Sequence, residues 1–466
     1  MPIYCTRLTA GLIRLKLEEH GLLKSTKIVT VESGMTVKAG KFSVEFIHVN
    51  HSIADSVAFA IHTGLGTVVH TGDFKIDTTP IDGGMMDLGR LAEIGQEGVL
   101  CLMSDSTNAE RPGFTESERK VGESFETLFR KAGNNRIIVA TFSSNIHRVQ
   151  QIMNVAASLG RKVALVGRSL ENVVSISAEL GYLNIPEGIV IDINMINRYP
   201  ADKLVIITTG SQGEPMSALT RMAFSDHRKV EIHPNDYVII SATPIPGNEK
   251  TVSRVVNELM KLGADVVYEK MYEVHVSGHA CQEELKMIMG IVKPKYFIPV
   301  HGELKHLRKH AGLALSMGIP KENILIADNG RVAEISKKAL RCTSTVPAGR
   351  VFVDGYGVGD VGSVVLRDRK HLAQDGLVIV AVCIDRESGM IVSGPDVVTR
   401  GFVYVKESEE LINAAREVAV EAIEAQTDGG YFDWNSIKAS LRDEISHLMY
   451  ERTKRSPMIL PVIMEV

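Results

Sequence analysis

Several residue types and patterns are scarce in this 466-residue chain, and each absence excludes a class of protein. The five cysteines are scattered and form no CxxC pair, so neither a disulfide framework nor a cysteine zinc site is expected. No apolar run reaches the roughly 18 residues of a membrane span, and no signal peptide leads the chain. These absences predict a soluble, cytoplasmic protein. The formal net charge of −4 excludes a global basic field, so any nucleic-acid site has to be a local groove.

What is present is a chain with room for roughly two to four domains. Its first hundred residues hold strand patterns in close succession, separated in several places by Gly and Asp turns. They lie at residues 27–32, 42–49, 56–63 and 66–72. This spacing predicts a mostly antiparallel sheet. A further buried strand at 98–105 ends in an acid, Asp105.

From about residue 117 to 275 the pattern changes to alternating strands and helices. Apolar runs of about six residues are each followed by a turn rich in small polar residues and then by a helical pattern. Such alternation is typical of a parallel α/β sheet, whose ligand crevice lies outside the carboxyl ends of its strands. After a Gly- and Val-rich connection at 346–363, a compact α+β module follows from about residue 370.

Five side chains suited to metal binding or catalysis lie at or beyond predicted strand ends: His51, Asp73, Asp105, His279 and His301. Taken alone, a histidine in such a place is more often structural. Taken alone, Asp73, in the passage "VVHTGDFKID", is more typical of a turn cap than of a ligand. Taken together, imidazole and carboxylate groups held by rigid strand ends suit zinc or manganese.

Three turns with small residues precede helices, at 141–145, 208–214 and 275–280. Each leaves backbone N–H groups for an anion, although helix capping is the ordinary role of such residues. Their occurrence in one α/β block favours a phosphate-rich ligand.

His306 and His310 have the i, i+4 spacing of metal ligands on the helix after His301. The neighbouring Lys and Arg side chains instead predict a solvated basic helix face at these two histidines.

Seven segments in the same order resemble the ribonuclease J family: "NHSIADS", "TGDFKID", "SDSTNAE", "TFSSNIHRVQ", "TTGSQGEPMSAL", "HVSGHACQEELK" and "PVHGELKHL". That family belongs to the metallo-beta-lactamase superfamily and carries an inserted beta-CASP domain. The resemblance implies an α/β fold with three components. These are an incomplete metallo-beta-lactamase αββα sandwich, an inserted parallel α/β beta-CASP domain and a small α+β C-terminal domain.

The resemblance also implies a division of the chain. The first part of the metallo-beta-lactamase domain is expected at 1–116, the beta-CASP domain at 117–275 and the return segment of the first domain at 276–345. A linker at 346–369 would lead to a C-terminal oligomerisation domain at 370–466.

Site residues follow from the resemblance in three groups. It assigns metal binding to His51, Asp73 and His301, with Asp73 as the carboxylate that bridges two zinc ions. It assigns catalysis to Asp105 and His279, the latter near the scissile phosphate. It assigns substrate contact to two segments: Phe142, Ser143, Ser144, His275, Val276, Ser277, Gly278 and His279.

The implied activity is that of a ribonuclease with 5′–3′ exonuclease and endonuclease action in RNA maturation and decay. In that chemistry a metal-bound hydroxide attacks the phosphodiester. The implied cofactor is Zn²⁺, two per complete site, with Mn²⁺ as the alternative. The implied partners are 5′-monophosphorylated single-stranded RNA and a second copy in a homodimer or homotetramer, or a paralogue. No membrane is involved.

One departure from the family is large: the HxHxDH segment that supplies most metal ligands in the superfamily is absent from this sequence. The three ligands that remain do not suffice for two metals, because each ion needs about four donors. We therefore expect a family member that lacks an N-terminal segment and is inactive as given. The alternative is a catalytically inactive RNA-binding or assembly subunit. A smaller departure is Cys281, where the family often has a serine near the 5′-phosphate.

Overall fold

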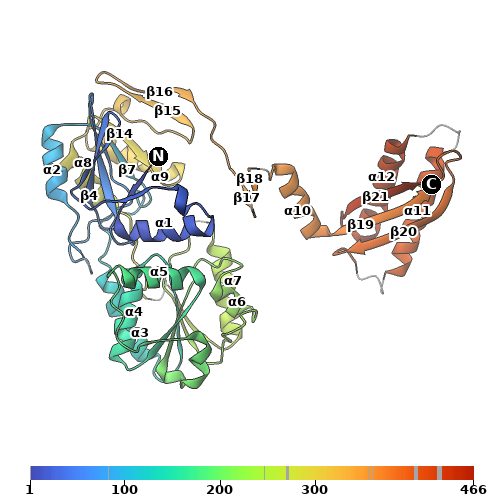
Figure 1. Cartoon of the computed structure of the whole chain (residues 1–466), viewed down its shortest axis with the longest axis horizontal. Helices are drawn as coiled ribbons and strands as arrows, with labels where there is room; N and C mark the ends of the chain where they lie inside the picture. The colour runs from blue at the N-terminus through green and yellow to red at the C-terminus, as the bar shows by residue number, and fades with distance from the viewer. Residues whose placement is uncertain are drawn as a thin grey trace. The chain divides into compact units, whose positions relative to one another are not determined.

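The computed structural model of the chain describes residues 2–81, 83–245, 247–268, 272–355, 357–359, 361–403, 408–427 and 433–466. The chain divides into two compact units after Val346 (Figure 1). Each unit has hydrophobic cores of its own. Among the helices described, none is long and apolar enough to cross a membrane.

The first unit contains a mixed six-stranded sheet with the order β14-β7-β6-β5-β4-β3. Its strands are β3 (Thr36–Ala39), β4 (Phe42–His48), β5 (Val57–Thr63), β6 (Gly66–His70), β7 (Val99–Asp105) and β14 (Tyr296–Val300). Strands β3 to β6 pair antiparallel, as their close spacing predicts. Strands β7 and β14 then join parallel to β6. The chain leaves this sheet after β7, forms a second sheet with β8 to β13, and returns to the first sheet at β14.

Helices α2 (Leu88–Glu97) and α8 (Gln282–Val292) share a core with this sheet, and α9 (Leu304–Ser316) follows β14. In that core Ile94 of α2 and Ile288 of α8 are buried with Leu102 of β7. Smaller elements complete this part: β1 (Ile3–Cys5), α1 (Arg7–Glu19), η1 (Leu23–Ser25), β2 (Ile28–Thr30), η4 (Lys321–Asn323), β15 (Arg331–Ile335) and β16 (Leu340–Thr345).

The second sheet is entirely parallel, with the order β10-β9-β11-β8-β12-β13. Its strands are β8 (Ile137–Ala140), β9 (Lys162–Val166), β10 (Val190–Ile191), β11 (Leu204–Thr208), β12 (Tyr237–Ile240) and β13 (Asp265–Tyr268). Central strands such as β8, "IIVA", are apolar at every position because helices cover both faces of the sheet.

The covering helices form two layers, visible on opposite sides of the sheet in Figure 1. One core holds residues of α3 (Arg119–Lys131), α4 (Ile146–Ser158) and α5 (Arg168–Glu179). The other holds residues of α6 (Ala218–Ala223) and α7 (Glu249–Lys261). Two 3₁₀ turns, η2 (Ile193–Arg198) and η3 (Ala201–Lys203), precede β11.

The second unit is built on a three-stranded sheet, order β20-β19-β21. Its elements are β17 (Val353–Asp354), β18 (Gly357–Val358), α10 (Ser363–Asp375), β19 (Leu377–Ile384), β20 (Ile391–Arg400), α11 (Glu409–Thr427), α12 (Trp434–Thr453) and β21 (Met458–Glu465). Side chains of β19 are alternately buried and half-exposed. The buried ones pack against α11 and α12.

The expected α/β architecture, with an inserted parallel block and a small α+β region at its end, is confirmed. The exact boundaries of the three expected domains, the first of which is in two segments, and of the linker stay predictions.

Candidate active site

Three neighbouring parallel strands bring two acids and a histidine to one edge of the six-stranded sheet. Asp105 at the end of β7 is in register with Val300 of β14, and β6 runs parallel on the other side of β7. The carboxyl ends of parallel strands meet at one edge. Asp73 shortly after β6, Asp105 and His301 directly after β14 therefore converge, although they lie far apart in the sequence.

The backbone turns sharply at two of these strand ends. Gly72 has φ +61°, and a Cβ there would lie 2.8 Å from the carbonyl oxygen of Val57, so the position requires glycine. His301 has φ +57°, which is uncommon for a residue with a side chain, and Gly302 follows at φ +123°. Backbone outliers of this kind concentrate at functional sites. Here one unusual backbone position, Gly72, directly precedes Asp73, and another is His301 itself.

The converging side chains form a compact cluster. One nitrogen or oxygen atom each of Asp73, Asp105, His279 and His301 lies within 4.8 Å of the others. The Nε2 atoms of His51 and His301 lie 3.9 and 3.8 Å from the two oxygens of Asp73. In the described part of the chain, the Asp73 carboxylate accepts no hydrogen bond from a backbone N–H. Its position therefore favours the ligand interpretation over the turn cap.

His51 is held in one tautomer by a backbone carbonyl. Its Nδ1 lies 2.8 Å from the carbonyl oxygen of Gly278. Because a carbonyl only accepts, Nδ1 carries the hydrogen and Nε2 keeps its lone pair toward Asp73. Burial lowers the pKa of His51, which favours the same neutral form. The fit is close, since a Cβ on Gly278 would lie 2.5 Å from this Nδ1.

His279 and Asp105 form a hydrogen-bonded pair, with Nδ1 and Oδ2 separated by 2.7 Å. Burial alone would lower the pKa of His279, but the hydrogen bond and charge of Asp105 outweigh it and raise the pKa. Burial would raise the pKa of Asp105, yet hydrogen bonds from His279 and Thr107 keep that pKa below its usual value. The backbone N–H and hydroxyl of Thr107 donate to Oδ1. The pair therefore favours an ionised acid beside a histidine that retains its proton.

A cavity of about 750 Å³ opens beside the cluster, and His51, His279 and His301 form part of its wall. The wall also carries hydroxyls and amides, two cations, two acids and an apolar patch. These further residues include Ser52, Thr107, Asn108, Ser144, Asn145, Ser277, Arg111, Lys305, Glu110, Glu303, Phe142, Pro244 and Ile245. The mixture suits a ligand that carries both phosphate and apolar rings.

Most of the predicted substrate residues line this cavity. From the second segment these are His275, Ser277, Gly278 and His279. From the first segment Phe142 and Ser144 do so, whereas the Ser143 hydroxyl lies 3.0 Å from that of Ser169. Val276 is buried in the hydrophobic core beneath. Substrate contact stays a prediction for both segments, and the side chains of Ser143 and Val276 do not lie on this wall.

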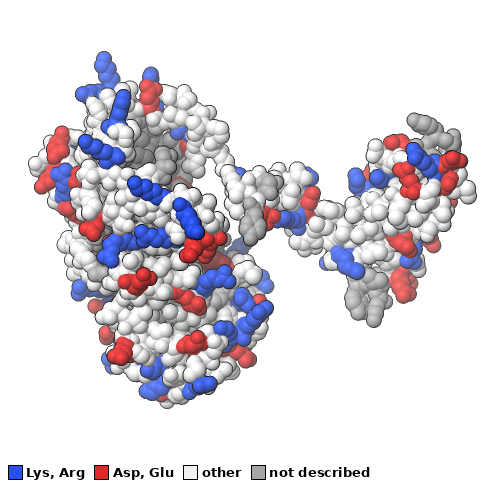
Figure 2. All heavy atoms as spheres, in the orientation of Figure 1, with Lys and Arg blue, Asp and Glu red and all other residues white. Residues whose placement is uncertain are grey.

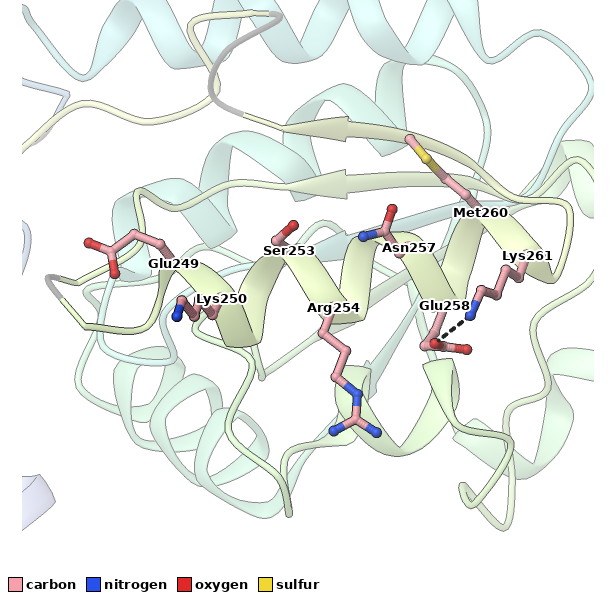
Figure 3. Close-up of a pocket in the computed structure, with 8 residues that line it drawn as sticks. All are labelled: Glu249, Lys250, Ser253, Arg254, Asn257, Glu258, Met260 and Lys261. Carbon is pink, nitrogen blue, oxygen red and sulfur yellow. Dashed lines mark hydrogen bonds and ion pairs between the residues drawn. The ribbon is translucent and has the colours of Figure 1, made fainter.

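A second hollow, of about 830 Å³, lies on the outer face of α7 (Figure 3). Its lining residues are Glu249, Lys250, Ser253, Arg254, Asn257, Glu258, Met260 and Lys261. They all come from one helix and project outward, and Lys261 is paired with Glu258 at 2.9 Å. No histidine or converging group occurs there, so we assign no site to this face.

Known protein families match most of the chain. Residues 134–259 match the ribonuclease J beta-CASP domain, and 263–325 match a Zn-dependent metallo-hydrolase RNA specificity domain. Residues 364–466 match the ribonuclease J C-terminal domain.

Full-length similarity decides the family. Ribonuclease J2 of Bacillus subtilis (strain 168) is 43% identical over 467 residues, which cover 100% of this chain and 84% of that protein. Ribonuclease J 1 of Streptococcus pyogenes serotype M3 is 42% identical over 464 residues, 100% of this chain and 82% of that protein. The chain belongs to the ribonuclease J family. A third relative, ribonuclease J 2 of Staphylococcus aureus (strain NCTC 8325), is 40% identical over 100% of this chain and 83% of that protein.

The ribonuclease J family matches coincide with parts of the fold. The beta-CASP match runs from just before β8 into α7, and the metallo-hydrolase match contains both His279 and His301. Among solved structures, a protein of unknown function from Enterococcus faecalis V583 aligns with a TM-score of 0.50 at 15% identity. That alignment covers 70% of this chain and 74% of the other, and it supports a shared fold alone.

The expectation of open N–H groups at the start of α8 is wrong. The N–H of Cys281 donates to the Glu284 carboxylate at 2.8 Å. The next two N–H groups donate to the carbonyls of Arg111 and Gly113. The Cys281 sulfur is buried and lies 3.3 Å from the Thr115 hydroxyl oxygen. These bonds use the donors that an anion would need.

The prediction of a solvated face at His306 and His310 is also wrong. His310 is fully buried, its Nδ1 lies 3.0 Å from the Ser106 hydroxyl, and its ring packs edge-on against Phe297. Burial lowers the pKa of His310 to about 4. His306 is only slightly exposed and lies 3.5 Å from Glu110. His310 packs onto the sheet, whereas His306 and Lys305 both line the cavity near Glu110.

Two supporting residues escaped sequence reasoning. The Asn108 amide donates to the Ser277 hydroxyl at 2.9 Å and to the His279 carbonyl at 2.8 Å. The Thr115 hydroxyl donates to the same carbonyl at 2.8 Å. Asn108 lies in "SDSTNAE", three residues after Asp105, which is a weak signal, and Thr115 has none.

Proposed function

We propose a ribonuclease function: RNA binds in the cavity, and its phosphodiester bonds are hydrolysed at the Asp/His cluster, both from the 5′ end and internally, when the HxHxDH ligands that this sequence lacks are also present. One observation carries the proposal. Metal-type side chains from three adjacent strand ends meet beside the segment His275 to His279, in a cavity with Arg111 and Lys305 on its wall. Cations and hydroxyls are the groups that bind phosphate.

His51, Asp73 and His301 would hold the metal ion, with Asp105 nearby. The donors fit a zinc or manganese ion: two imidazoles and a carboxylate, with the His51 lone pair already oriented by a carbonyl. When bound, a divalent ion would neutralise charge on the phosphoryl oxygens and activate the attacking water.

His279 would act on the scissile phosphate. Asp105 accepts the Nδ1 hydrogen and leaves Nε2 of the same ring for the substrate. A histidine that retains its proton can donate it to the leaving oxygen. Asp105 then stabilises and orients the ring.

5′-Monophosphorylated single-stranded RNA is the proposed substrate, and association between copies through residues 370–466 is proposed for assembly. Charges of both signs cover the visible face of the first unit in Figure 2, with Lys and Arg gathered over α1. That local basic area fits an RNA partner despite a net charge of −4.

Two substitutions test the division of roles in a protein that also carries the HxHxDH ligands. We expect His301→Ala to lose bound metal and activity together, because an imidazole ligand is removed. We expect His279→Ala to keep most metal but to lose about 100-fold or more of the activity, as for a proton donor. Metal content by mass spectrometry and cleavage of 5′-labelled RNA measure the two effects.

The control is His447→Ala, since this imidazole is exposed on α12 and pairs with the exposed Glu451. This substitution should change neither the bound metal nor the cleavage of RNA. Equal metal loss in His279→Ala and His301→Ala would contradict the proposed roles.

The second candidate function is an inactive RNA-binding or assembly subunit, favoured by the absence of HxHxDH from the sequence. Unaltered protein that binds RNA but cuts none with added Zn²⁺ or Mn²⁺ would establish this alternative.

A further inference from the structure

Arg148, in the first turn of α4, is completely buried. Its Nε lies 2.8 Å from a carboxylate oxygen of Glu118. Its Nη1 lies 3.0 Å from the carbonyl oxygen of Ser241 and 2.9 Å from Nδ1 of His275. Its Nη2 lies 3.4 Å from the carbonyl oxygen of Val276. One guanidinium thus joins α4 to three other segments, one of which carries the cavity residue His275.

The contact with His275 determines where that ring carries its hydrogen. An arginine side chain donates and cannot accept. Nδ1 of His275 is therefore the acceptor, and the hydrogen of the neutral ring is on Nε2. The surrounding charges also favour the neutral ring, because the cations Arg148, Arg111 and Lys75 are nearby. The acid Glu118 is paired with Arg148. Burial and these cations lower the pKa of His275 to about 3.

The imidazole ring of His275 lies at the cavity. It is one of the wall residues, and its ring centre lies 6.4 Å from that of Phe142. Within the described residues Nε2 has no hydrogen-bond partner. The one N–H donor of the ring is therefore available to a molecule in the cavity.

The other histidine of the same segment is fixed in the opposite way. His279 has its Nδ1 against a carboxylate, which only accepts, so its hydrogen is on Nδ1. His275 has its Nδ1 against a guanidinium, which only donates. The segment therefore presents one neutral donor and one histidine that retains a proton beside an acid.

We propose that Arg148 is a positioning residue that fixes His275 as a neutral hydrogen-bond donor, through Nε2–H, to an oxygen of the bound RNA. The proposal rests on the proposed function for the identity of the ligand. The arrangement of Arg148 and His275 does not depend on it, because it is present without RNA.

Another buried arginine provides a matched control. Arg136 pairs with the buried carboxylate of Asp236 and donates to the carbonyl of Glu231, as Arg148 does with its own partners. Among the described residues it makes no hydrogen bond to a histidine, and it does not line the cavity. Arg136→Lys thus measures the cost of losing a buried guanidinium elsewhere in the same sheet domain.

The first measurement is the protonation of His275 by ¹⁵N NMR of the full chain labelled at histidine, without metal or RNA. His275→Gln assigns the signal. We expect Nδ1 without hydrogen and Nε2 with hydrogen, unchanged between pH 5 and pH 8. In Arg148→Lys, which cannot reach all four acceptors, the hydrogen should redistribute or the ring should titrate. A hydrogen on Nδ1 of His275 in the unaltered protein overturns the proposal.

The second measurement is binding of a 5′-monophosphorylated single-stranded RNA by fluorescence anisotropy, with EDTA present to prevent cleavage. We expect His275→Leu to weaken binding about tenfold, the effect of one hydrogen bond to a charged group. His275→Gln should stay within about threefold, because its amide can replace Nε2–H.

Arg148→Lys should weaken binding as His275→Leu does, and the double variant should be no weaker than either. Arg136→Lys should bind normally. Unchanged binding in Arg148→Lys, or additive losses in the double variant, overturns the proposal. If Arg148→Lys does not fold, the comparison of His275→Leu with His275→Gln still decides, since equal loss in both overturns it. Absence of RNA binding in the unaltered protein, with the NMR result as expected, would instead overturn the proposed function.

Discussion

An imidazole is a donor, an acceptor or an ion according to what its two nitrogens meet. In this site three histidines meet three different groups at Nδ1: a backbone carbonyl at His51, a carboxylate at His279 and a guanidinium at His275. The first leaves a lone pair for a metal, the second retains a proton, and the third offers an N–H. Residue type alone does not distinguish these roles.

A substitution at Gly278 tests how a single residue positions the His51 ring. A methyl group there would lie 2.4 Å from the Ser52 hydroxyl and 2.5 Å from Nδ1 of His51. We expect Gly278→Ala to displace the His51 ring and to weaken metal binding about tenfold or more, as for the loss of a ligand's supporting contact. Titration of the metal by calorimetry measures this.

Gly290→Ala is the control, because a Cβ there meets its nearest atom, Met317 Cε, at an ordinary 3.7 Å. Metal affinity in Gly278→Ala equal to that of the control would show that Gly278 does not hold His51.

At the scale of elements, Glu284 links three segments around the site. It lies in the first turn of α8, is completely buried, and accepts from the N–H groups of Ile76, Thr115 and Cys281 at 2.7 to 2.8 Å. These donors belong to the loop after β6, the loop after β7 and the start of α8. The carboxylate therefore holds the loop that carries Asp73 against the helix that follows His279.

Glu284→Gln should lower the free energy of unfolding by about 2 to 4 kcal/mol, because an NH₂ group then faces backbone N–H groups that donate to this carboxylate and, within the described residues, to no other acceptor. Urea unfolding followed by circular dichroism measures this.

Glu283→Gln is the matched control, since that side chain is partly exposed and pairs with Lys286. Its effect should stay within about 1 kcal/mol. A similar loss in both variants would mean that Glu284 has no special structural role.

At the scale of the whole molecule, the second unit leaves an apolar sheet face open. The register places Val398, Ile379 and Leu460 in one row across β20, β19 and β21. Leu460, Val462 and Met464 are 37–50% exposed on the same side of β21. Helices α11 and α12 pack with the opposite side of the sheet. An exposed apolar face of this kind supports the proposed association between copies.

If this face joins two copies, Leu460→Glu should weaken association about tenfold or more, because it places a charge in an apolar contact. Light scattering during gel filtration measures the mass. Gln426→Glu adds the same charge on exposed α11 and should leave the mass unchanged. An unchanged mass in Leu460→Glu would exclude this face from the assembly.

Local patterns were enough for a large part of the fold. Alternation and turn spacing predicted the antiparallel strands near the start, and apolar runs followed by helical patterns predicted the parallel block. The same reasoning placed Asp73, Asp105 and His301 at strand ends, where the structure has them. These features depend on residues that are close together in the sequence, so a sequence pattern is enough to predict them.

The remaining features depend on contacts between distant segments. Asp73 and His301 meet because β6, β7 and β14 are adjacent, and no periodicity reports which strands become neighbours. His310 is buried because one side of its helix packs against the sheet, which a row of nearby cations concealed. Hydrogen-bond partners also come from distant segments, since the role of His275 depends on Arg148, which lies over a hundred residues away in the sequence. Secondary structure and candidate residues are thus encoded locally, whereas the protonation and grouping of those residues arise only when the chain has packed.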